Sequence, residues 1–272
     1  MENIVFLEGV TFTIALLIYL AATVLFFVYV IGRKDKIGKY AVYVTISGFA
    51  VHTLSMIFRA IEAGRLPFSN QFEFASSFTW GIVLIFIIIQ YRYKFTSLGA
   101  FVMPLAFLMM MYASMQSRTI NPLMPALQSN WLTIHVGTAV ISYGSFAVAC
   151  GLSIMYLINE KKMNKIDSKL PDVEAYDFLS YRVIAFGYLM LTVVIITGAI
   201  WAKYAWSRYW AWDPKETWSL ITWLIYSVYL HLRFNRGWKG RPAAWFSVIG
   251  FLSVIFTFIG VNILLPGLHS YK

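Results

Sequence analysis

The sequence predicts an all-α fold, a polytopic membrane bundle of about eight transmembrane helices that forms a single integral membrane domain over residues 1–272. Hydrophobic residues make up 60% of the 272 positions and charged residues only 12%, and the mean hydropathy is +0.68. Soluble domains carry about 45–50% apolar and about 25% charged residues. A soluble fold is therefore excluded, and we expect nearly the whole chain to lie in the membrane.

Eight apolar segments have the length of about 20 residues that a helix needs to cross the hydrocarbon core. In chain order the predicted spans are Gly9–Ile31, Lys39–Ile61, Glu73–Tyr91, Ser97–Ser114, Leu132–Ile158, Val183–Trp201, Thr217–Phe234 and Ala243–Leu264. The first is too long for a signal peptide and lacks a small-residue cleavage site after a basic start, so we expect it to be retained.

Basic residues are concentrated in alternate loops. The loops after the first, third, fifth and seventh spans hold 15 of the 22 Lys and Arg residues. Cytoplasmic loops of membrane proteins carry this excess, so both termini and residues 201–223 are expected to be extracytoplasmic. The same bias accounts for the net charge of +10 without nucleic acid as a partner.

Tryptophan is concentrated just before the seventh span. Six of the ten tryptophans lie between residues 201 and 223, namely Trp201, Trp206, Trp210, Trp212, Trp218 and Trp223. In the same segment, Asp213, Pro214 and Glu216 have the spacing of a helix capping box with proline at the first helical position. We expect this box to start the seventh helix and to orient the preceding tryptophans over its mouth.

The four histidines divide by expected depth into two pairs. His52 and His231 fall within the second and seventh spans, whereas His135 and His269 fall at the external ends of the fifth and eighth. A lone histidine is more often a hydrogen-bonded packing residue, but ionisable residues inside membranes are functional candidates. Paired neutral imidazoles suit the two axial positions of haem iron, so we predict that all four are axial ligands. A zinc site would need further converging ligands and fits less well.

The remaining polar residues allow more than one interpretation. Arg59 lies two turns, or about 10 Å, from His52 and would either hold a haem propionate or extend to the interface. External Lys203, Arg208 and Lys215 are alternative propionate partners. Gly48 would leave room for a ring edge or allow close helix packing. The single cysteine, Cys150, is expected to be buried and inert, and no C-x-x-C-H sequence is present for covalent haem.

Polar and aromatic residues also form a stripe along the seventh span. Glu216, Leu220, Trp223, Ser227 and His231 recur every three or four residues and would share one helix face. The stripe is about 22 Å long and would connect the external motif to His231.

These residues resemble the tryptophan-rich, or WWD-domain, haem-handling proteins, especially the CcsA or ResC component of the system II cytochrome c synthase. The resemblance covers nearly the whole chain and is carried by residues 206–216, 66–73, 131–135 and 268–271. Ser207 differs from the glycine expected in the tryptophan motif, and Ala211 occupies a small-residue position.

The resemblance implies a function for the chain as a haem-binding and haem-translocating subunit. Haem b, bound without a covalent link as the transported substrate, would pass from the cytoplasmic side to the external tryptophan platform for thioether attachment to an apocytochrome c with a C-x-x-C-H sequence. His52 and His231 match the transmembrane ligand pair, and His135 and His269 the external pair. The other implied haem-binding residues are Trp206, Trp210, Trp212, Asp213, Trp218, Arg59, Arg208 and Lys215. No catalytic acid, base or nucleophile is implied.

The resemblance also implies a membrane partner of the CcsB or ResB type, because this chain lacks the large external domain which that component contributes. The chain would then be the membrane subunit of a haem lyase that acts only with its partner, in the plasma membrane or, if plastid-encoded, in the thylakoid. A b-type cytochrome that transfers electrons, a haem exporter without ligation activity, and a transporter of another solute remain alternatives. No inverted repeat supports the last of these.

Overall fold

The computed structural model describes residues 2–160, 173–265 and 267, and this part of the chain is helical without any strand. The main helices are α1 (Glu2–Gly32), α2 (Asp35–Ala63), α3 (Gln71–Tyr93), α4 (Gly99–Ser114), α5 (Asn130–Asn159), α6 (Val173–Trp206), α7 (Pro214–Asn235), α8 (Arg241–Ile255) and α9 (Val261–Leu264), with short 3₁₀ turns η1 (Thr96–Leu98) and η2 (Pro125–Leu127). Each predicted span lies within or overlaps the helical segments of the structure, and the all-α membrane fold class is confirmed.

Seven of the described helical segments are long and apolar enough to cross a membrane. The exception among the eight predicted spans is α7, which has 22 residues. Its hydropathy is lower because threonine, serine, tryptophan and tyrosine replace aliphatic side chains along it. The chain is a multi-pass membrane protein.

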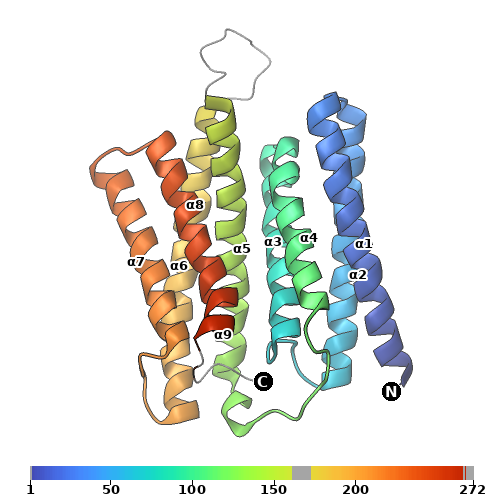
Figure 1. Cartoon of the computed structure of the whole chain (residues 1–272), viewed down its shortest axis with the longest axis vertical. Coiled ribbons are helices and arrows are strands. Elements are labelled where there is room, and N and C mark those ends of the chain that lie inside the picture. The colour runs from blue at the N-terminus through green and yellow to red at the C-terminus, as the bar shows by residue number, and fades with distance from the viewer. Residues whose placement is uncertain (1, 161–172, 266, 268–272) are drawn as a thin grey trace. The chain divides into compact units, whose positions relative to one another are not determined.

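The chain divides into two compact units, of which the first, Met1–Leu123, contains α1 to α4. In this unit α2 packs along α1, and α4 packs on both α3 and α1 (Figure 1). Aromatic rings fill the space between the helices: Phe12 lies 5.1 Å from Phe72 and Phe26 lies 5.7 Å from Phe86, measured between ring centroids. A Cβ atom on Gly48 would come within 2.7 Å of Ile18, so this glycine serves close packing of α2 on α1.

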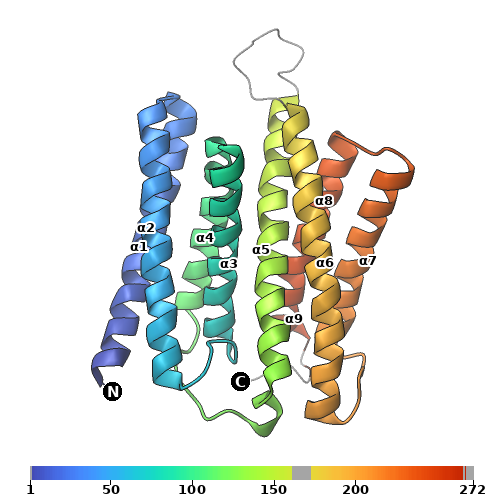
Figure 2. The same cartoon turned by 180° about the vertical axis from the view of Figure 1, so that it is seen from behind.

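The second unit, Met124–Lys272, contains α5 to α9. Here α5 and α6 lie side by side along their length, α8 packs on α5, and α7 contacts α6 and α8 (Figure 2). The ring of Phe146 stacks on that of Tyr226 with centroids 3.8 Å apart and an angle of 5° between planes. Gly187 lies against Phe146 and Gly250 against Tyr226, which leaves room for this pair.

Two local features differ from a run of simple spans. The predicted sixth span, Val183–Trp201, is only the middle of α6, which begins at Val173 and continues to Trp206. Beyond α8, residues Phe256–Gly260 form a π-helical turn before α9. In unit 2 the start of α5, the end of α6, the start of α7 and α9 lie at the same end of the helices (Figure 1).

Candidate functional site

The tryptophan segment of residues 201–223 contains the end of α6, the connection between α6 and α7, and the first part of α7 in unit 2. Asp213 accepts a hydrogen bond from the Lys215 backbone N–H at 3.0 Å, and the Glu216 carboxylate accepts from the backbone N–H groups of Asp213 and Ala211 at 3.2 and 2.8 Å. The predicted capping box is therefore confirmed. These bonds satisfy backbone donors at the start of α7 and fix the residues that precede it.

The tryptophans of this segment occupy different environments. Trp201 is buried and contacts Trp206 edge to face, with ring centroids 4.8 Å apart. Trp210 lies edge to face with the exposed Trp212 at 5.8 Å, and the buried Trp210 Nε1 has no hydrogen-bond acceptor among the described residues. Trp218 packs on Phe256 of the π-helical turn at 4.2 Å. The segment thus combines the buried ring of Trp201, the exposed ring of Trp212 and the buried indole N–H of Trp210.

Two residues of the segment have left-handed backbone conformations, Ser207 with a φ of 61° and Trp212 with a φ of 57°. Ser207 directly follows the last residue of α6, where a left-handed residue commonly ends a helix and glycine is favoured. The glycine expected at this position therefore has a backbone reason. Serine adopts the same conformation at a cost of about 1–2 kcal/mol.

The three predicted external cations lie in or beside this connection. Lys203 and Arg208 are exposed, and the Lys203 ammonium donates to the Ser207 carbonyl at 3.2 Å. Lys215 precedes the apolar part of α7 and is half-buried. Burial lowers the pKa of Lys215 to about 8, against the opposing effect of Asp213. The fraction of Lys215 that is positively charged therefore falls as the pH rises above neutral.

His135 lies near the start of α5 and faces α6. Its Nδ1 is 2.9 Å from the carbonyl oxygen of Val194, and its ring is nearly parallel to that of Trp201, with 15° between planes and 6.1 Å between centroids. A carbonyl oxygen only accepts, so Nδ1 carries the proton, and in the neutral imidazole Nε2 then carries the lone pair. Metal-binding histidines typically donate their other N–H in this way. His135 is thus held as an iron ligand would be.

The predicted partner of His135, His269, lies outside the described residues. Gly267, two positions earlier in the sequence, is described and lies directly against the Asp213 carboxylate and Pro214. The chain therefore returns to the start of α7 immediately before the segment that contains His269.

His52 lies in α2 of unit 1 and is completely buried. Its Nδ1 is 3.2 Å from the Tyr19 hydroxyl of α1, and its Nε2 is 2.9 Å from the Ser76 hydroxyl of α3. Both ring nitrogens are therefore hydrogen-bonded within unit 1, and an iron could reach Nε2 only after Ser76 releases it.

His231 lies in α7 of unit 2 and is exposed, with Nδ1 3.0 Å from the Asn235 side-chain nitrogen. His52 and His231 belong to different units, so their pairing stays a prediction. Two residues after His231, Arg233 makes a bidentate ion pair with Asp177 of α6 at 2.6 and 2.9 Å. Asp177 also accepts from the Gly240 backbone, so one carboxylate joins α6 to the turn between α7 and α8.

The predicted stripe along α7 faces α6 in its middle part. The Trp223 indole donates to Thr192 at 2.9 Å, and Ser227 is hydrogen-bonded to Tyr188 at 2.9 Å. These contacts give the stripe a packing role between the capping box and His231.

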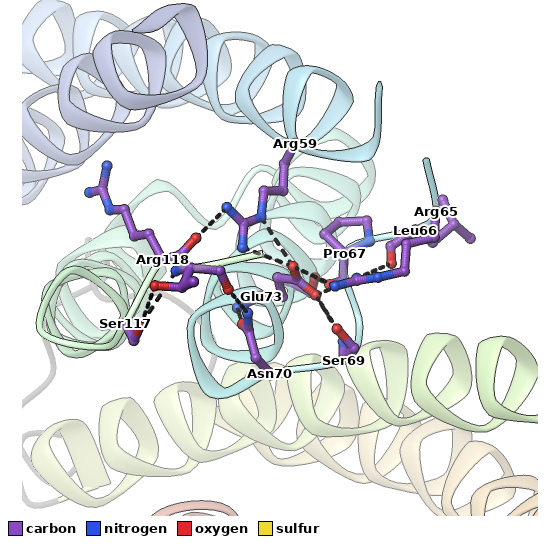
Figure 3. Close-up of polar contacts among 11 residues, drawn as sticks. Arg59, Arg65, Leu66, Pro67, Ser69, Asn70, Glu73, Ser117 and Arg118 are labelled. Carbon is purple, nitrogen blue, oxygen red and sulfur yellow. Dashed lines mark hydrogen bonds and ion pairs between the residues drawn. The ribbon is translucent and has the colours of Figure 1, made fainter. Parts of the chain in front are cut away.

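Arg59 lies at the end of α2 and is paired with Glu73 of α3 instead of extending to the interface. Both side chains are buried, and their closest ion-pair atoms are 3.0 Å apart. The Arg59 guanidinium also donates to the Arg118 carbonyl at 2.8 Å (Figure 3). A propionate at Arg59 stays a prediction, and it would have to share the guanidinium with Glu73.

Glu73 is the centre of this cluster. Its carboxylate also accepts from Arg65 at 2.7 Å and from the backbone and hydroxyl of Ser69 at 2.9 Å each, as Figure 3 shows. Asn70 caps α3 by accepting from the Glu73 backbone N–H at 2.8 Å. Residues 65–73 are therefore tied to the ends of α2 and α3 by a single buried carboxylate.

Two features of the site were not predicted. The Asn70-x-x-Glu73 spacing is typical of a capping box and could have drawn attention to Glu73 beside two arginines. Gly198 lies so close to the His135 ring that a Cβ atom there would be 2.7 Å from Cε1. A glycine in an apolar helix usually indicates helix packing, and the sequence carries no signal that this one faces a histidine.

Comparison with known proteins identifies the family. A profile of the cytochrome c assembly protein family matches residues 68–269. A cytochrome c biogenesis protein CcsA from Guillardia theta is 38% identical over 237 residues, covering 78% of this chain and 79% of that protein. Another, from Parasynechococcus marenigrum, is 34% identical over 293 aligned positions, covering 97% and 95%. The chain belongs to the CcsA-type cytochrome c biogenesis family.

A solved structure supports the same fold for this CcsA-type chain. The cytochrome c heme lyase CcmF matches with a TM-score of 0.71 and 15% sequence identity over 93% of this chain and 46% of that one. The chain thus spans about half the length of that structure, and at this identity the match shows the fold alone. Family membership gives the chain a role in cytochrome c biogenesis.

Proposed function

We propose that this chain is the haem-binding and haem-translocating subunit of a cytochrome c synthase, which delivers haem b to the tryptophan segment for attachment to apocytochrome c. The single observation that carries the proposal is the geometry of His135. Its Nδ1–H donates to the Val194 carbonyl and its ring lies along Trp201, so Nε2 has the lone pair that iron requires. The names of the CcsA relatives and of the heme lyase neighbour agree with haem as the substrate.

The chemistry requires positioning more than acid–base catalysis. In thioether formation the sulfur of a cysteine in the C-x-x-C-H sequence bonds to one vinyl carbon of haem, and the thiol hydrogen is added to the other. Atoms balance without a leaving group or an oxidant. His135 and His269 would hold the iron, and the tryptophan face would orient the ring and exclude water.

The outer residues of the tryptophan segment are assigned to the haem periphery. The buried Trp210 Nε1 would donate to a propionate, and Arg208 and Lys215 would supply positive charge. Trp206, Trp212 and Trp218 would form the apolar walls. Asp213 would act indirectly, by capping α7.

The transmembrane pair, His52 and His231, would bind haem during its passage from the cytoplasmic side. The hydrogen bond from Nε2 to Ser76 would have to open for His52 to take part. We further propose extracytoplasmic termini, a CcsB or ResB partner, and a plasma or thylakoid membrane as the location.

The test is the haem content of the full chain, produced with and without its partner, together with covalent attachment of haem to a C-x-x-C-H apocytochrome. We expect bound, six-coordinate haem in the chain and thioether product only when the partner is present. Haem-free chain under ample haem supply would refute the proposal. Haem that is reduced rapidly by quinol without product would identify a b-type cytochrome, and haem release without thioether formation would identify an exporter.

A further inference from the structure

The imidazole of His135 occupies a slot on α6 that exists only because residue 198 is glycine. A Cβ atom on Gly198 would lie 2.7 Å from Cε1 and 2.8 Å from Nδ1 of His135. Real Cβ atoms essentially never show contacts below 3.0 Å, so any side chain here would displace the ring. Trp201, three residues later on α6, lies nearly parallel to the same ring with centroids 6.1 Å apart.

The slot also determines which ring nitrogen carries the proton. The Val194 carbonyl, one turn before Gly198, lies 2.9 Å from Nδ1 and only accepts. A ring pushed away from Gly198 would lose this bond, and with it the preference for the tautomer that leaves the lone pair on Nε2.

We propose that Gly198 and the Val194 carbonyl are positioning elements that fix the tautomer and orientation of His135 and so present Nε2 to iron. The inference rests on the proposed haem-binding function, because it assigns His135 an iron to bind. Neither element would touch the iron. Loss of such outer contacts lowers metal affinity about 10- to 100-fold in other metal sites.

A plainer explanation is that Gly198 only allows α5 and α6 to approach, and the chain offers a matched control for it. Gly187, on the same helix, also lies against α5, and its Cβ atom would be 3.0 Å from Phe146 and 3.1 Å from Ser145. Gly187→Ala should therefore disturb the same pair of helices without touching His135.

The first experiment needs no haem. Nitrogen-15 NMR of the full chain labelled at histidine, assigned with His135→Gln, should show an Nδ1–H tautomer for His135 in the wild type and in Gly187→Ala. In Gly198→Ala this signature should be lost. An Nε2–H tautomer in the wild type, or an unchanged spectrum in Gly198→Ala, would overturn the inference.

The second experiment uses the chain produced with its partner. Gly198→Ala should retain about 10- to 100-fold less haem, and the haem that remains should shift from low-spin to high-spin absorption. In a His135→Gly background the same substitution should have no further effect. Equal losses in Gly187→Ala and Gly198→Ala would overturn the inference in favour of helix packing. A haem-free wild type with the expected NMR result would refute the proposed function and the role toward iron, while supporting the positioning of the ring.

Discussion

The end of unit 1 that carries Glu73 and the end of unit 2 that carries the tryptophan segment use polar groups in opposite ways. In unit 1, Arg59 and Arg65 both pair with Glu73, and both ring nitrogens of His52 are hydrogen-bonded. In unit 2, the Trp210 indole N–H has no acceptor among the described residues, and Arg208 is exposed.

This difference predicts that substitutions at the two ends will have different effects. Substitutions at the unit 1 end should mainly lower stability, whereas substitutions at the unit 2 end should mainly lower haem binding. His52 shows the contrast most clearly, because hydroxyls can donate or accept and so allow either tautomer. His135 faces a carbonyl, which allows one.

The largest effect on stability is expected for Glu73→Gln. Glutamine keeps the volume but removes the carboxylate that pairs with the buried Arg59 and the half-buried Arg65, which should cost about 3–5 kcal/mol. The measurement is thermal or denaturant unfolding of the detergent-purified chain. Glu160→Gln is the matched control. Its partner Arg241 is exposed and lies 3.5 Å from the Glu160 carboxylate, so this substitution should cost about 1 kcal/mol or less. Equal costs for the two variants would contradict the view of Glu73 as the centre of a buried cluster.

Replacing His135 or His52 with glycine should have different effects on stability. His135→Gly should lower retained haem about 10- to 100-fold or more, with added imidazole restoring it and with little change in the unfolding midpoint. His52→Gly should lower the midpoint as well, because it opens a cavity and leaves the Tyr19 and Ser76 hydroxyls without their partner. Haem absorption and unfolding curves on the same preparations test both. A stability loss for His135→Gly as large as that for His52→Gly would break the comparison.

The hydroxyl partners of His52 should act in opposite directions if Nε2 binds iron. Ser76→Ala removes a competing hydrogen bond of about 1 kcal/mol, so haem binding at the transmembrane site should rise about fivefold. Tyr19→Phe removes support from Nδ1 and should lower it. Haem titration in a His135→Gly background isolates this site. Changes of the same sign in both variants would show that Nε2 is not the ligand.

The smallest effect is expected for Trp210→Phe, which removes a buried indole N–H and keeps an aromatic ring. Stability should stay the same or rise slightly, because the donor has no acceptor among the described residues. Haem retention should fall about two- to fivefold if the N–H donates to a propionate. Haem retention equal to that of the wild type would remove Trp210 from the propionate site.

Most of the fold could be predicted from the sequence because the length of an apolar segment indicates whether it can cross a membrane, with the less apolar α7 as the exception. The start of α7 could also be predicted from the sequence, because the Asp213 capping box is a local pattern. The extension of α6 to Trp206 was missed because its last turn contains the exposed, polar-ended Lys203 and Tyr204. Local patterns do not show which helix faces which.

The Arg59 contacts and the Gly198 slot illustrate that limit. Arg59 is predicted to hold a propionate or to extend to the interface, but Glu73, 14 positions away, meets it because the intervening loop folds back. Gly198 and His135 are separated by 63 positions and meet because α5 and α6 pack together. Such pairings depend on tertiary packing, which hydropathy does not encode.

The π-helical turn Phe256–Gly260 changes the direction in which all later side chains point. A π turn holds one residue more than an α turn, so α9 is rotated by about 100° relative to an uninterrupted helix. With this rotation Val261 is buried and Ile263 is exposed. Removing one residue from the turn would restore regular α-helical bonding but turn Val261 outward. A single insertion or deletion in a relative at this point would therefore re-aim the chain that follows without altering any helix before it.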